Sequence, residues 1–169
     1  MNATALQYPI ELDRAAIERV LPHRGEILCL REVCVLAHDH FIAAALWPAT
    51  LPLLQGHFPG RPLVPGVLLV EAVAQAAGAG LLVGDAQARA LGADHIGVLV
   101  AIRKCAFRRP LPADTELAIE IHARQMSTVA VAVGALLQVA QREVATVEIV
   151  LAHTPLQQLD TLLHEAAAP

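Results

Sequence analysis

Apolar residues fall into long runs along this chain, and short groups of proline, glycine and polar residues separate the runs. Five or six runs have the length, the β-branched content and the flanking turn residues that are typical of strands. They lie at 27–37, 40–47, 96–107, 115–126, 127–139 and 143–153. Tight polar breaks at 38–39 and 140–142 predict hairpins between neighbouring runs.

Two segments predict helices, and a third short helix is predicted in the tail from residue 155. Residues 12–21 form a short segment with Asp13 placed as its N-cap, and Pro22 follows its end. The run 66–84 is apolar on nearly all sides, which is typical of a buried helix.

The order of these elements predicts an α+β fold. Strands precede and follow the 66–84 helix, so one antiparallel sheet is expected to wrap around it. The segment 48–65, rich in proline and glycine, and the polar segment 85–94 are predicted to connect this helix to the strands as irregular loops.

The apolar stretch 63–84 is also long enough to cross a membrane. Glu71 and Gln75 stand four residues apart within it and share one helical face. A charge at bilayer depth costs at least about 2.5 kcal/mol. Pro62 and Pro65 shorten the span further. We therefore predict a buried helix in a soluble protein, with no membrane span.

Composition narrows the class of protein. Hydrophobic residues make up 56% and charged residues 17% of the 169 residues, which indicates one folded domain over 1–169, with a helical segment at 1–22 and a tail at 155–169. The net charge of −4 argues against a nucleic-acid partner. The three cysteines form no paired motif, and the charged N-terminal region is unlike a secretion signal, so we predict a cytoplasmic location.

Candidate chemistry is concentrated in the stretch GHFPGRPLVPGVLLVEAVAQ, residues 56–75. His57 lies in a constrained loop, and imidazole is well matched to general-base work near neutral pH. Glu71 lies in the apolar helix, where desolvation favours the protonated, acidic form of a carboxyl group. The amide of Gly66, at the helix start, is placed to polarise a carbonyl. The alternatives are a histidine that holds its loop and a Glu71–Arg61 ion pair.

The same stretch resembles the signature of the 3-hydroxyacyl-acyl-carrier-protein dehydratases of the FabZ type. LPHR at 21–24 and FRRPL at 107–111 agree with that family in order and spacing, so the resemblance covers roughly residues 12–152. It implies a hot-dog fold, in which the sheet wraps around the 66–84 helix and dimerises by extending the sheet. Family assemblies often continue to trimers of dimers.

By this resemblance, His57 of one chain faces Glu71 of its partner. His57 handles the C2 proton of a 3-hydroxyacyl thioester, and Glu71, oriented by Gln75, holds or protonates the departing hydroxyl. The Gly66 amide binds the thioester carbonyl. Phe58 and Val67 complete the predicted substrate contacts, and the acyl chain lies in an apolar tunnel beside the helix. No cofactor or metal is expected.

Acyl carrier protein is the partner that the resemblance implies. It is acidic, and its arm is phosphorylated, so basic residues near the tunnel mouth would steer it. The candidates are Arg103, Lys104, Arg108 and Arg109. For any one of these residues, a solvated strand end is an equally good interpretation.

Departures from the family pattern suggest a specialised relative. Gly25 stands where the family usually has an aromatic residue, Arg31 where it has an aspartate, and Arg103 where an aspartate usually precedes the lysine. We interpret these changes as a sign of a dedicated lipid, polyene or polyketide pathway rather than bulk fatty-acid synthesis.

Two other functions stay open: an acyl thioesterase on the same fold, and a non-catalytic acyl-carrier-binding protein. The intact pair His57 and Glu71 argues against both. His23 is interpreted as a residue that stabilises its loop. The group at 38–40, His-Asp-His, is interpreted as a polar turn because no third ligand is spaced to join it.

Overall fold

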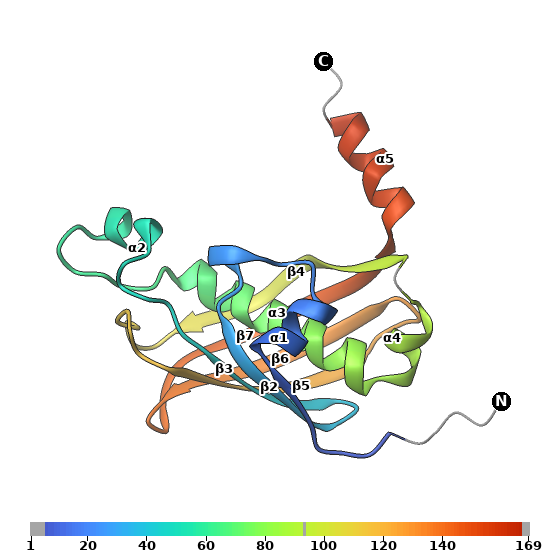
Figure 1. Ribbon diagram of the computed structural model, residues 1–169, viewed down its shortest axis with the longest axis horizontal. Coiled ribbons are helices and arrows are strands. Elements are labelled where there is room, and N and C mark those ends of the chain that lie inside the picture. Colours follow the sequence, from blue (N-terminus) through green and yellow to red (C-terminus); the bar gives the residue numbers. More distant parts are fainter. Residues whose placement is uncertain (1–5, 93, 167–169) are drawn as a thin grey trace.

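The computed structural model describes residues 6–92 and 94–166 (Figure 1). Within them one antiparallel sheet has seven strands in the order β1-β2-β3-β5-β6-β7-β4. The strands are β1 (Ile10–Asp13), β2 (Leu30–Ala37), β3 (His40–Ala45), β4 (His95–Phe107), β5 (Leu117–Gln125), β6 (Ala130–Val139) and β7 (Arg142–Pro155). The helices are α1 (Arg14–Val20), α2 (Pro52–His57), α3 (Gly66–Gly84), α4 (Ala86–Ala90) and α5 (Leu156–Ala166), with a 3₁₀ turn at Gly25–Ile27.

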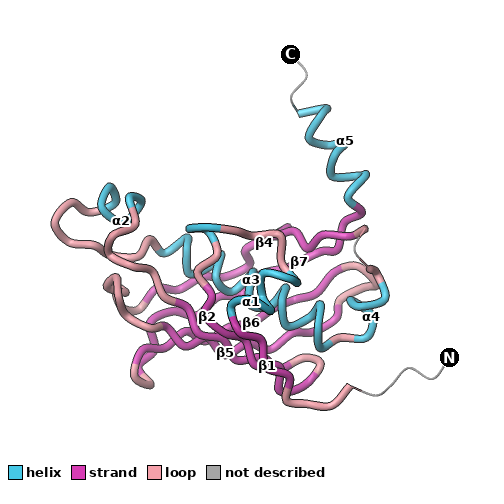
Figure 2. The backbone as a smooth tube through the Cα atoms, in the orientation of Figure 1, coloured by secondary structure: helices cyan, strands magenta, loops and turns pink. Residues whose placement is uncertain are grey.

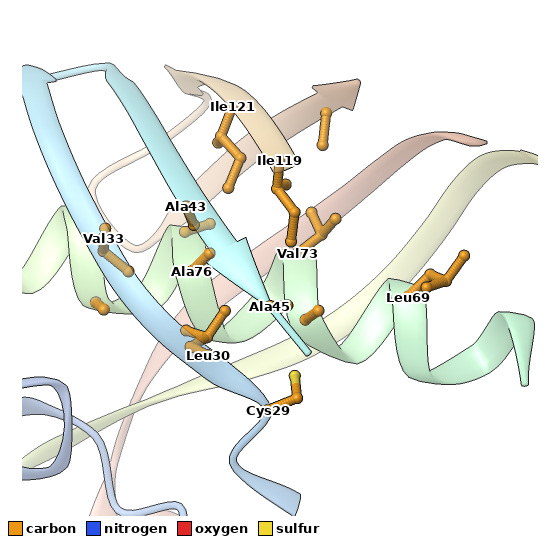
Figure 3. Packing of buried hydrophobic residues seen from close by; sticks show 14 of the residues in the cluster. Cys29, Leu30, Val33, Ala43, Ala45, Leu69, Val73, Ala76, Ile119 and Ile121 are labelled. Carbon is orange, nitrogen blue, oxygen red and sulfur yellow. The ribbon is translucent and has the colours of Figure 1, made fainter. Parts of the chain in front are cut away.

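Helix α3 lies across the concave face of the sheet, as predicted, and this arrangement confirms the hot-dog fold (Figures 1 and 2). Its residues Leu69, Val73 and Ala76 pack in one cluster with residues of β2, β3 and β5 (Figure 3). Although α3 is long and apolar enough to cross a membrane, more than half of its residues are buried inside the protein. Burial of this apolar surface accounts for its composition.

Several elements lie where capping and turn residues in the sequence predicted them. Asp13 caps α1 by accepting a hydrogen bond from the amide of Ala16 at 2.7 Å. The last hairpin turns at Ala140 and Gln141, whose φ angles of 48° and 63° match the left-handed backbone conformation that both residues of a type I′ hairpin turn require. A helix follows residue 155, as predicted, and α5 stands away from the sheet (Figure 1). Residues 167–169 of the predicted tail lie outside the described residues.

Three short elements contradict the predicted loops and boundaries. Strand β1 pairs with β2 ahead of α1, where only a helix was expected. Helix α2 lies within the segment 48–65, with Pro52 in its first turn, and α4 lies within 85–94. Each has only four to six residues, and such short elements depend on tertiary contacts rather than on their own periodicity.

Small residues of α3 admit large side chains of the sheet. A Cβ at Gly80 would lie 2.6 Å from the ring of Phe41, which is completely buried, whereas a Cβ at Gly78 would come no closer than 3.6 Å to another residue. Gly80→Ala is therefore expected to lower the free energy of unfolding by about 1–3 kcal/mol. Gly78→Ala should raise it by up to about 1 kcal/mol through helix propensity. Urea unfolding of both variants checks this pair, and equal effects would contradict it.

Candidate active site

The carboxylate of Glu71 is held by a buried amide. Gln75, only 2% exposed, donates from Nε2 to Glu71 Oε1 and to the carbonyl of Ile27, both at 2.8 Å. Burial raises the pKa of the Cys29 thiol to about 12, so the thiol stays protonated, and its Sγ lies 4.0 Å from Gln75 Oε1. These contacts fix which way the amide points. The predicted neighbourhood of Glu71 and Gln75 is thus present in the structure.

His23 is a second neighbour of Glu71 that the sequence interpretation missed. Its Nε2 lies 3.5 Å from Glu71 Oε1, and its Nδ1 is buried without a hydrogen-bond partner among the described residues. The expected alternative, a pairing of Glu71 with Arg61, is not among the ion pairs of the described chain. His23 therefore belongs to the site rather than only to its loop.

His57 ends helix α2 and is exposed. Its Nδ1 lies 3.2 Å from the carbonyl oxygen of Leu63. Because a carbonyl only accepts hydrogen bonds, Nδ1 carries the proton in the neutral ring, and Nε2 is left with a lone pair. The ring of Phe58 packs edge-on against it, with centroids 4.4 Å apart. This is the tautomer that a general base requires.

Gly66 is the first residue of α3, and Pro65, the N-cap, supplies no side-chain hydrogen bond there. The amide of Leu68 donates to the Pro65 carbonyl at 3.0 Å, whereas the amides of Gly66 and Val67 have no acceptor among the described residues and are available to a ligand. A Cβ at Gly66 would lie 2.7 Å from the ring of Phe107, so glycine is what lets that ring cover the helix start. Val67 is 73% exposed beside it.

Two cavities meet at Glu71. One, of about 130 Å³, follows α3 from Glu71 to Leu82 and reaches the start of β4 and the end of β7. The other, of about 210 Å³, lies towards α2 and is lined by Trp47 and Leu53, among others. His57 lines neither cavity. Within one chain, the predicted base therefore lines neither of the two cavities that contain the predicted acid.

The four basic residues predicted for carrier docking are all exposed, on β4 and just after it. Arg108 Nε lies 3.4 Å from a carboxylate oxygen of Glu143, and Arg109 donates to the carbonyl of the same residue at 2.7 Å. Arg103 contacts only the sulfur of Met126 among the described polar groups, at 4.0 Å. Arg103 and Lys104 thus keep their charges free for a partner.

One expectation about the 38–40 group is wrong. Strand pairing places His40 opposite His122, and Glu120 lies on the same outer face. The carboxylate of Glu120 lies 3.1 Å from His40 Nε2 and 3.7 Å from His122 Nε2. Two further ligands, Glu120 and His122, therefore lie beside His40, on a strand that is distant from it in sequence. The three side chains are partly exposed, and their ion pairs account for the cluster.

A family model described as the FabA-like domain matches residues 21–148, which include Glu71, His57 and both flanking motifs. The chain belongs to this family. Among curated members, it is 39% identical over 111 residues to the 3-hydroxyacyl-[acyl-carrier-protein] dehydratase FabZ of Verminephrobacter eiseniae (strain EF01-2). That alignment covers 65% of this chain and 73% of the relative. The resemblance to FabZ-type proteins stated from the sequence is confirmed.

Solved structures share the fold of this FabA-like chain. The dehydratase heterocomplex ApeI:P from Xenorhabdus doucetiae matches with a TM-score of 0.71 at 17% identity, covering 94% of this chain and 99% of that one. The fluoroacetyl-CoA thioesterase FlK matches with a TM-score of 0.62 at 13% identity, covering 79% and 97%. At such identities these likenesses show the FabA-like chain's fold and not its reaction.

Proposed function

We propose that this FabA-like protein removes water from 3-hydroxyacyl thioesters carried on acyl carrier protein, giving trans-2-enoyl thioesters. The observation that carries the proposal is the carboxylate of Glu71, held by the buried Gln75 within the region that the FabA-like model matches, in a chain 39% identical to a named FabZ dehydratase. A carboxyl group fixed in this way, at the junction of two cavities, is placed to act on a substrate hydroxyl.

The reaction needs one proton taken and one given. Nε2 of His57 accepts the C2 proton, and the C2–H electrons form the new double bond as the C3–O bond breaks. Glu71 protonates the departing hydroxyl or holds it while it leaves as water. The first amides of α3, at Gly66, stabilise the charge that develops on the thioester oxygen. Phe58 and Val67 are the further substrate contacts in this proposal. The net change is the loss of one water, and no oxidant or cofactor is required.

A homodimer brings the two groups together in this proposal. Strand β4 is an edge of the sheet and exposes Val100 and Ile102, each by 55%. An exposed apolar edge invites pairing with a second copy. Such a pairing would bring His57 of one chain to Glu71 of the other. A trimer of dimers and a cytoplasmic location stay predictions.

Acyl carrier protein is expected to dock beside this edge. Arg103 and Lys104 are exposed on β4, and Arg108 and Arg109 follow it, so positive charge is concentrated on one strand. An acidic carrier would be steered there by long-range attraction, and raised salt would slow the encounter.

Mass spectrometry of a 3-hydroxyacyl carrier protein, before and after incubation with the protein, tests the proposal. Loss of one water from the acyl group supports dehydration. Loss of the whole acyl group would instead make the protein a thioesterase, and an unchanged substrate would indicate a carrier-binding protein without activity.

His23 is expected to act through Glu71 as a positioning residue. His23→Ala should lower kcat about 10-fold and leave KM nearly unchanged, because an interaction with a charged group contributes about 1.5–3 kcal/mol. His23→Gln keeps a donor and should recover most of kcat. Steady-state kinetics of the two variants check this, and equal losses in both would indicate that His23 serves only the loop.

A further inference from the structure

The cavity beside α3 has an unusual composition at the end away from Glu71. Its wall on α3 is a single stripe, formed by Glu71, Ala74, Gln75, Gly78, Leu81 and Leu82. At 1.5 Å per residue, this stripe is about 16 Å long from Glu71 to Leu82. Leucine, alanine and glycine make up most of it. The far end, however, also contains two histidines, His95 and His153.

Three observations place these histidines at the Leu82 end. The start of β4 and the end of β7 both lie towards the C-terminal end of α3 (Figure 1). An open hollow next to the cavity shares Leu82 and His95 with it but does not include Glu71. Asp85, the residue that follows α3, is near enough to act on the charge of His153.

Both imidazoles offer hydrogen-bonding atoms to this end of the cavity. His95 Nδ1 lies 3.0 Å from the carbonyl oxygen of Leu91, so in the neutral ring its Nε2 is free to accept. Burial and the nearby His95 lower the pKa of His153, against the opposing effect of Asp85, which favours the neutral form of this ring. A neutral imidazole presents one donor and one acceptor.

The residues around this end of the cavity favour a bound chain that ends in an oxygen-bearing group over one that ends in a methyl group. His153 pairs across the sheet with Gly97, and nothing lies within 4 Å of where a Cβ of Gly97 would be, so there is room beside the ring. The adjoining hollow is lined by three arginines, Arg19, Arg24 and Arg89. A methyl-ended chain would cover the imidazole nitrogens without pairing them, whereas a hydroxyl or carboxylate would pair with them.

We propose that this end of the cavity binds the far end of the acyl chain, and that the chain carries an oxygen-bearing group there. The inference rests on the proposed function, because it takes Glu71 to mark the reacting end of the substrate. His95 and His153 are then specificity-determining residues, and the arginines of the hollow add attraction if the group is a carboxylate.

The test compares 3-hydroxyacyl carrier proteins of equal chain length that end in methyl, hydroxyl or carboxylate, over a series of lengths. Loss of water is followed by mass spectrometry to give kcat/KM. At the lengths that react, we expect an oxygen-bearing end to raise kcat/KM by at least about 10-fold over methyl. A higher rate with carboxylate than with hydroxyl would assign part of the preference to the arginines.

Variants connect the preference to the histidines. His153→Leu should bring the ratio between end groups close to one, and His153→Gln, which keeps a donor and an acceptor, should retain it. His122→Leu, on the outer face of the sheet, is the matched control and should leave the ratio unchanged.

Two outcomes separate this inference from the proposed function. Loss of water from none of the substrates would contradict the proposed function and this inference with it. Loss of water with equal or higher rates for methyl-ended chains would overturn this inference alone, as would a ratio that His153→Leu does not change.

Discussion

Dehydration of a 3-hydroxyacyl carrier protein is expected to slow by about 10²–10⁴-fold when His57 is replaced by alanine, the range that a positioned general base contributes. The tautomer set by the Leu63 carbonyl leaves Nε2 as the basic atom, and alanine removes it. Because His57 is exposed, the change creates no cavity in the core and should not affect folding. Rates of water loss by mass spectrometry, with thermal unfolding of each variant, check this prediction.

Glu71→Gln is expected to cause a loss of similar size. The amide has the shape of the carboxyl group and can still accept from Gln75 Nε2, but it can neither give nor take a proton at neutral pH. His38→Ala and Glu120→Gln, which alter an exposed and a partly exposed residue that line neither cavity, are the matched controls and should keep full activity. If either His57→Ala or Glu71→Gln kept more than about a tenth of the activity, that residue would have no proton-transfer role.

Long periodic segments made most of the fold predictable. Helix α3 could be predicted because nineteen consecutive residues, almost all apolar, follow a proline and fit no other element. The six longer strands could be predicted because turn residues separate their apolar runs, and the turn at 140–141 is an example. Strand β1 could not, because four residues are too few for their apolar–polar alternation to indicate a strand, and they gain their place by pairing with β2. Helix α2 could not be predicted either, because the prolines and glycines around it are typical of a loop.

The site was predictable where its residues share one motif and not where the fold brings distant ones together. Gln75 is one helical turn from Glu71, so its contact follows from spacing alone. His23 is far from Glu71 in sequence, and nothing local connects them. The LPHR motif that contains His23 was a signal, since an unexplained histidine beside a recognised motif is a candidate for the same site. His122 and Glu120 were missed near His40 for the same reason, because pairing of β3 with β5 is not local.

Mixing two inactive variants should restore activity if the site is shared between two chains. In a dimer of one His57→Ala chain and one Glu71→Gln chain, one site carries both changes, and the other combines an intact His57 with an intact Glu71. Random pairing makes half of the dimers mixed, each with one intact site of two, so about a quarter of wild-type activity is expected. Co-expression of the two chains with different tags, followed by purification on both tags in turn, isolates the mixed dimer. That dimer should then have about half of wild-type activity.

The geometry of the single chain is the reason to expect this result. His57 lies on α2, beyond the first turn of α3, and lines neither of the cavities that meet at Glu71 (Figure 1). A site within one chain would require α2 to move, and the mixed dimer would then contain no intact site, because each chain lacks one of the two groups. Mixed dimers without activity, alongside inactive parent variants, would therefore place both residues in one chain. A chain that carries both changes, co-expressed with wild-type chain, is the control. Their mixed dimer contains no intact site if each site is shared between two chains. It contains one intact site if each site lies within a single chain.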